Sequence, residues 1–262
     1  MLFKLKPLPA IVSAAFLAGG LTLAGTAQAD VTLNAGVKMS SESNVFGYPN
    51  KADELTDSYR VLNASAVYFT PLNATETTYF IGQVGANASK YSTYSSLDNS
   101  SVMASVGLYQ QLSSSWSGTV TGSGFSRTTQ LDANNAKGNG ATLEIKNQLS
   151  ETIWVKGSAA YNSSNTNLDK NSSSGKTYGL SMGYMPLKDT FLSLGYSRSV
   201  TDFKNTAPFF QATSQTLYAD VTQRLAKNVF LNGGYARQNN ESNNAGSASN
   251  NNIVSLGLNF SY

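Results

Sequence analysis

Residues 254–262, VSLGLNFSY, alternate strictly between apolar and polar or small side chains. The apolar members are Val254, Leu256, Leu258, Phe260 and Tyr262. Successive side chains of a β-strand point to opposite faces, so this pattern predicts a strand with one apolar and one polar face. Residues 31–39, far away in the sequence, alternate in the same way.

Ten further segments with the same period lie between these two, at 59–69, 76–90, 101–111, 115–128, 140–149, 152–162, 175–185, 190–199, 214–224 and 228–238. An even number of antiparallel strands of about ten residues is typical of barrels in bacterial outer membranes. The sequence therefore predicts an all-β fold: a closed antiparallel transmembrane β-barrel of about 12 strands, with both termini at one end.

The connections between these segments alternate in length. Each short one carries a leucine, and Leu72, Leu112, Leu149, Leu187 and Leu225 are 40, 37, 38 and 38 residues apart. The longer connections are rich in Ser, Asn, Asp and Gly and lie near 40–58, 91–100, 129–139, 163–174, 200–213 and 239–250. A propeller repeat of similar length holds four strands, whereas this repeat has room for two. We expect short periplasmic turns and long extracellular loops.

The first residues have the pattern of an export signal. Lys4 and Lys6 precede an apolar run over 10–24, and Ala27-Gln28-Ala29 has the small-x-small pattern of a signal-peptidase site. We therefore expect 1–29 to be a cleavable signal peptide and 30–262 to form the barrel domain in the outer membrane. No later stretch approaches the ~20 apolar residues of a membrane helix.

Composition excludes several classes of function. The chain contains no Cys and no His, so it can form neither disulfides nor thiolate metal sites, and it lacks the commonest general base. We predict no catalytic residue, no metal site and no cofactor. Cleavage after Ala29 leaves 16 basic and 15 acidic residues, a net charge of +1, which argues against a nucleic-acid partner.

The polar phase of the strands supplies candidate pore-lining residues: Lys38, Arg60, Arg127, Glu144, Lys146, Lys156, Asp220 and Arg224. Rings of Arg and Lys in a pore favour anions, so this basic excess predicts a lumen that prefers anionic solutes. Alternatively, these groups pair with one another and fill the interior, Glu144 with Lys146 or Lys156. Large inward residues favour a blocked lumen: Tyr79, Ile81, Tyr109, Trp154 and Tyr218.

A second basic set falls in the apolar, outward phase near the extracellular strand ends: Lys90, Arg198 and Arg237. Lys and Arg bind phosphate well, so we expect these three side chains to contact lipopolysaccharide. The alternative is that they only face water beside the loops.

The end of the chain resembles a known signal. Outer-membrane barrels, porins among them, end in a strand with an aromatic last residue and apolar residues at alternate positions, and Leu258, Phe260 and Tyr262 are similar to it, with Tyr in place of the usual Phe. The resemblance implies recognition by the barrel-assembly machinery. Separately, Ser43-Asn44-Val45-Phe46 resembles the opening of barrel families of which some are associated with exopolysaccharide export.

Two functions fit these observations. The first is a narrow passive pore for ions or small solutes, anionic ones included. The second is a non-conducting barrel that serves as a surface scaffold, an adhesin or a component of a polysaccharide-export assembly.

Overall fold

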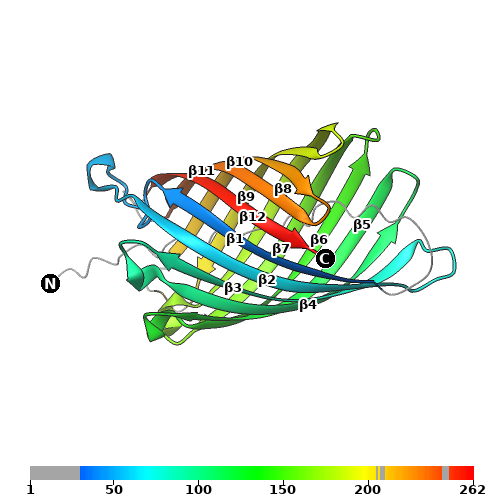
Figure 1. Ribbon diagram of the computed structural model, residues 1–262. Helices are drawn as coiled ribbons and strands as arrows, with labels where there is room; N and C mark the ends of the chain where they lie inside the picture. Colours follow the sequence, from blue (N-terminus) through cyan, green and yellow to red (C-terminus); the bar gives the residue numbers. More distant parts are fainter. Residues whose placement is uncertain (1–29, 205, 207–209, 244–247) are drawn as a thin grey trace.

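The protein is a closed antiparallel barrel of twelve strands, as the alternating segments predict. The structure is a computed structural model that describes residues 30–204, 206, 210–243 and 248–262. The strands tilt around the barrel axis, and β1 lies beside β12 (Figure 1). The proposed signal peptide lies outside the described residues. No helix among the described residues is long and apolar enough to cross a membrane.

The strands follow one another around the barrel in sequence order. Their bounds are β1 Asp30–Glu42, β2 Asp57–Pro71, β3 Thr78–Tyr91, β4 Asn99–Gln111, β5 Trp116–Thr129, β6 Ala136–Gln148, β7 Ile153–Thr166, β8 Ser173–Leu187, β9 Thr190–Phe203, β10 Phe210–Ala226, β11 Val229–Ser242 and β12 Ser249–Ser261.

Most strands extend beyond the predicted segments toward the long loops. For example, β12 begins at Ser249 and β6 at Ala136, whereas the alternation begins at 254 and 140. The added residues are mainly Ser, Asn and Gly, because a strand that rises above the membrane needs backbone pairing but no apolar face. Hydrophobic periodicity therefore marks the membrane-spanning part of each strand and misses its continuation into water.

The barrel closes where β1 meets β12. The register runs from Asn34 opposite Ser261 to Glu42 opposite Ile253. At the end of the seam where β1 starts, the Leu33 amide donates to the Tyr262 carbonyl at 2.7 Å, and the Tyr262 amide donates to the Leu33 carbonyl at 2.8 Å. This closure leaves no unpaired sheet edge, which a strand structure in lipid requires.

The outer wall is apolar and the interior has no apolar core. Outward residues such as Val31, Leu62, Val106 and Leu180 are about 60% exposed in the isolated chain, as expected for side chains that meet lipid. Only six hydrophobic residues are buried within the described part of the chain, and they lie near the two barrel ends: Val45, Tyr59, Phe69, Tyr79, Ala136 and Ile253. The side chains of a soluble sandwich would instead meet in a buried core.

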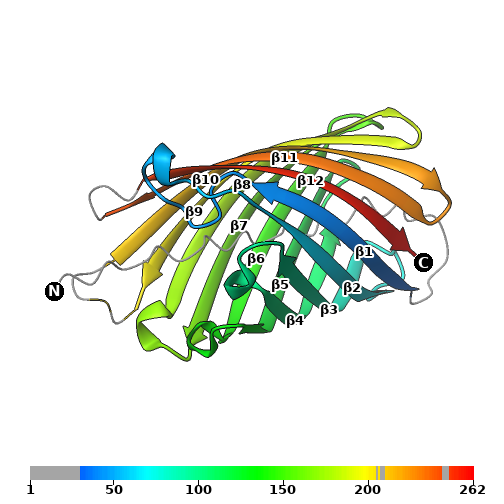
Figure 2. The same cartoon turned by 60° about the vertical axis from the view of Figure 1, so that its left-hand side comes forward.

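The two barrel ends differ as the loop lengths predict. Short turns join β2–β3, β4–β5, β6–β7, β8–β9 and β10–β11 at the end where β1 starts. The opposite end carries the long connections, four of which contain 3-10 turns: Lys51–Asp53, Ser95–Leu97, Asp132–Asn134 and Asp169–Asn171. Figures 1 and 2 show these turns gathered at one end of the barrel. Hereafter the two ends are called the short-turn end and the long-loop end.

Candidate pore lumen

The polar phase of the strands lines the inside of the barrel, as predicted. Seven of the eight candidate pore residues lie in the inward phase: Lys38, Arg127, Glu144, Lys146, Lys156, Asp220 and Arg224. Midway along the strands, inward polar side chains such as Ser65, Gln83 and Thr142 are partly exposed rather than buried. Water therefore reaches the interior wall.

Arg60 is the exception, and its predicted place in the lumen is wrong. It is in phase with the exposed Leu62 and lies directly opposite Met39 on β1 and Lys90 on β3. Directly opposed residues share a face of the sheet, and Met39 is 61% exposed on the outer wall. Arg60 lies only three residues from the start of β2 at Asp57, so its outward side chain is close to the long-loop end of the barrel.

One pair of candidate residues neutralises itself. Lys156 Nζ lies 2.7 Å from Glu144 Oε1, and the two side chains are 26% and 35% exposed. Lys146 lies directly opposite Lys156 but forms no ion pair with any described residue. Its Nζ instead sits 5.3 Å from the centre of the Trp154 ring, within the range of a cation–π contact. Among the described residues in this part of the lumen, Lys146 is thus the cation without an ion pair.

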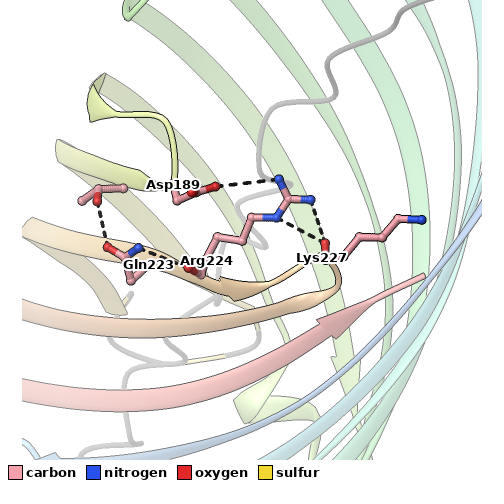
Figure 3. A network of polar contacts seen from close by, with 5 residues as sticks. Asp189, Gln223, Arg224 and Lys227 are labelled. Atoms are coloured by element: carbon pink, nitrogen blue, oxygen red, sulfur yellow. Dashed lines mark hydrogen bonds and ion pairs between the residues drawn. The ribbon is translucent and has the colours of Figure 1, made fainter.

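Arg224 is held at the rim of the short-turn end. Its Nη2 and Nε donate to the Lys227 carbonyl at 2.8 and 3.2 Å, and its Nη1 lies 3.9 Å from the Asp189 carboxylate (Figure 3). The Arg224 amide also donates to the Asp189 carbonyl at 2.8 Å. The guanidinium therefore connects two adjacent turns. Most of its contacts serve this structural role.

The long-loop mouth contains acidic groups that the sequence pattern misses. Glu42 continues the inward phase of Lys38, and it accepts a hydrogen bond from Asn251 Nδ2 at 3.3 Å. Asp57 accepts from the Thr93 and Tyr94 amides and so holds the next loop to β2. Both residues fall in the predicted loop 40–58, because the apolar alternation of the first segment ends before Glu42 and that of the second begins after Asp57. Counting the inward positions of β1 onward from Lys38, through Ser40, would have reached Glu42.

Two of the large inward rings, Trp154 and Tyr218, lie against the wall of the barrel. Trp154 on β7 lies over Gly183 of β8, where a Cβ would overlap the indole, and its ring is stacked 6.0 Å from Phe191 on β9. Tyr218 on β10 covers Gly195 of β9 in the same way. Each glycine lies directly opposite the residue that covers it. The rings can therefore lie flat because their cross-strand neighbours have no side chain.

The Ser43–Phe46 motif anchors the first loop to the barrel mouth. Asn44 is 2% exposed; its Nδ2 donates to the Tyr48 and Asn250 carbonyls at 2.8 and 3.2 Å, and its Oδ1 accepts from the Tyr48 amide at 2.9 Å. Phe46 packs edge-on against Tyr94 of the second loop, with ring centres 4.9 Å apart. The motif thus joins the first loop to β12 and to the second loop.

The predicted outward cations lie on the outer wall near the long-loop end. Arg198 and Arg237 are exposed and in phase with Tyr196 and Tyr235. Lys90 is also exposed, and its Nζ lies 3.1 Å from an oxygen of the largely buried Asp98. The described residues contain no group of three or more His, Cys, Asp or Glu side chains that would bind a metal ion.

No protein-family model matches the sequence, and no curated protein matches it either. Among solved structures, an outer membrane channel from Pseudomonas putida F1 covers 93% of this chain and 99% of its own, at 11% identity and a TM-score of 0.65. The KdgM porin, in complex with disordered oligogalacturonate, matches 87% of this chain and 99% of its own at 8% identity and a TM-score of 0.51. The NanC porin matches 86% and 98% at 10% identity, also with a TM-score of 0.51. The chain thus has the fold of bacterial outer-membrane porins and channels.

Proposed function

We propose that this protein is a narrow passive pore for ions and small solutes in a bacterial outer membrane. The observation that carries the proposal is the arrangement of the lumenal rings. Trp154 and Tyr218, two of the large lumenal side chains, lie flat over Gly183 and Gly195. The polar wall between the two ends is partly exposed. Rings that lie along the wall leave the axis for solute.

The charges of the lumen support a preference for anions at the short-turn end. Three basic residues, Lys146, Lys156 and Arg224, and two carboxylates, Glu144 and Asp220, lie in the inward phase of this half of the barrel. Glu144 neutralises Lys156 and Asp189 lies near Arg224, whereas Lys146 forms no ion pair with any described residue. The complex of the similarly folded KdgM porin with an acidic oligosaccharide is consistent with this type of solute.

Single-channel recording tests the proposal. Residues 30–262, refolded into a planar bilayer under a salt gradient, should give steady current steps with a reversal potential on the anion-selective side. A folded, heat-modifiable barrel that carries no current would contradict the pore and favour a scaffold or an export component.

We also propose that the last strand is the recognition signal for barrel assembly. Leu258 and Phe260 lie in the outer phase of β12, Tyr262 continues this phase one residue beyond the strand, and Phe260 and Tyr262 are 47% and 87% exposed. Support comes from this exposed aromatic edge together with the resemblance of the sequence. Replacing Tyr262 with Ala should slow insertion in the presence of assembly machinery while leaving spontaneous refolding in detergent unchanged.

A further inference from the structure

We propose that the outer wall binds the phosphates of an outer-leaflet glycolipid through a belt of six cations, with an acyl-chain groove beneath one part of it. The six are Arg60, Lys90, Lys137, Lys176, Arg198 and Arg237. All are exposed and share the outward phase of their strands, and each lies near the long-loop end. The corrected position of Arg60 places it in this belt.

The belt has almost no protein counter-charge. The side chains of Arg60, Lys137, Lys176, Arg198 and Arg237 form neither a hydrogen bond nor an ion pair with any described residue, and only Lys90 has a partner, Asp98. In the described strands, the outward phase holds two carboxylates, Asp202 and Glu241. Each lies four residues nearer the strand tip than Arg198 or Arg237. Unpaired cations at this position are therefore available to an external anion.

Two of the cations are placed side by side. Arg60 lies directly opposite Lys90 on the outer face of β2 and β3. Like charges that face each other across a strand pair destabilise a sheet unless an anion lies between them. Asp98 reaches Lys90 but not Arg60. A phosphate bound between the two side chains would remove this repulsion, since guanidinium and ammonium groups both bind phosphate oxygens.

Tyrosines fix the depth of the belt in the membrane. Tyr178 lies directly opposite Arg198, and Tyr161 lies directly opposite Lys176. Tyr196 and Tyr235 each precede an arginine by two residues on the same face. Outward aromatic rings mark the membrane–water interface of a barrel. The cations are therefore at the level of lipid headgroups, where the phosphates are.

A shallow outer groove of about 440 Å³ lies beside the Arg60–Lys90 pair. Its outward lining consists largely of small residues on β2 to β5, namely Ala64, Ala86, Ala88, Ser100 and Ser126, together with Leu62, Val102 and Thr128. Ala88 is two residues from Lys90 on the same face, and Ser126 lies directly opposite Lys137. The groove thus has cations on both sides, which fits an acyl chain in the groove and phosphates above it.

The test measures the temperature at which refolded residues 30–262 lose their heat-modifiable mobility in micelles doped with lipid A. The variant Arg60→Gln/Lys137→Gln removes the two cations that lie beside the groove and have no protein partner, and Ala64→Leu/Ala86→Leu fills the groove. Lys188→Gln/Lys227→Gln is the matched control, because it removes the same charge from exposed positions at the short-turn end.

Bis-phosphorylated lipid A should raise the midpoint of the wild type and the control alike. The cation variant should lose most of this rise and the groove variant part of it, while single-channel currents stay unchanged in both. A full rise in the cation variant would overturn the proposal. So would an equal rise of the wild type with dephosphorylated lipid A or with phosphatidylglycerol, a result that needs no variant to fold.

Discussion

Glycines opposite the lumenal rings determine how much of the barrel interior is free. A Cβ at position 183 would overlap the Trp154 indole, so Gly183→Ala should turn the ring toward the axis. We expect a smaller single-channel conductance and a loss of roughly 1–3 kcal/mol in unfolding free energy, as for other overpacked sites. Gly157→Ala on β7 is the control, because no atom lies within 4 Å of the added methyl group. Equal conductance in both variants would mean that Trp154 does not border the solute path.

Two adjacent lumenal charges should act on selectivity in opposite directions. Lys146→Gln removes a lumenal cation, so the reversal potential should move toward the cation-selective side. Glu144→Gln releases Lys156 from its 2.7 Å ion pair and should move the potential the other way. Because the pair is partly exposed, its loss should cost at most about 1 kcal/mol of stability. Shifts of the same sign in both variants would contradict an electrostatic origin of the selectivity.

Residue phase was predictable wherever an alternating stretch fixes it. Lys38, Lys146 and Asp220 face inward because their strands are apolar on the other side. For Arg60, the charge suggested the lumen while the phase of Leu62 required the outer wall. Phase decides because a strand cannot turn one side chain without turning its neighbours. The partner of Glu144 and the position of the Trp154 ring depend on side-chain rotamers. The alternation of residues along a strand does not specify rotamers.

At the scale of the elements, the first loop depends on one amide side chain. Asn44→Ala removes three side-chain hydrogen bonds from a buried position, at a local cost of roughly 1–3 kcal/mol. We expect trypsin to cut the variant faster after Lys51 in the same loop, while the strands remain protected. Asn50→Ala, which removes only an exposed hydrogen bond to Asp53, should be cleaved at the wild-type rate. Equal rates for both variants would show that Asn44 does not hold the loop.

The number and order of the strands followed from the sequence, whereas several of their ends did not. At the short-turn end, β8 and β10 run into the predicted turns and end with register shifts, at Tyr184/Leu187 and Arg224/Ala226. Backbone hydrogen bonds decide where these two strands end. Pro186 and Leu225 lie in the turn sequences, but each strand can still pair with one of its two neighbours there. At the long-loop end, the strands extend into water and need no apolar face. The alternating pattern in the sequence therefore ends before the strand ends.

For the whole molecule, the two faces of the wall should tolerate charge very differently. Val106, in the middle of β4, is 58% exposed on the outer side, and its neighbour Ser105 faces the lumen. Val106→Arg should lower the unfolding free energy in lipid by roughly 2–4 kcal/mol. Ser105→Arg should refold with near wild-type stability and change the current instead. Denaturant titration in vesicles measures the first effect, and equal losses in both variants would contradict a lipid-facing outer wall.

The contact between β1 and β12 also determines whether the sheet has exposed edges. The seam joins Asn34 to Ser261 and Leu33 to Tyr262, so it pairs the first strand with the last. Without β12, the sheet is open and has two unpaired edge strands, both of which are templates for pairing with other chains. Each of these edges finds its partner within the chain only in the other, because β1 and β12 come from opposite ends of the barrel sequence. Closure therefore removes both edges at once, and a barrel with β1 and β12 paired presents no edge strand to other chains.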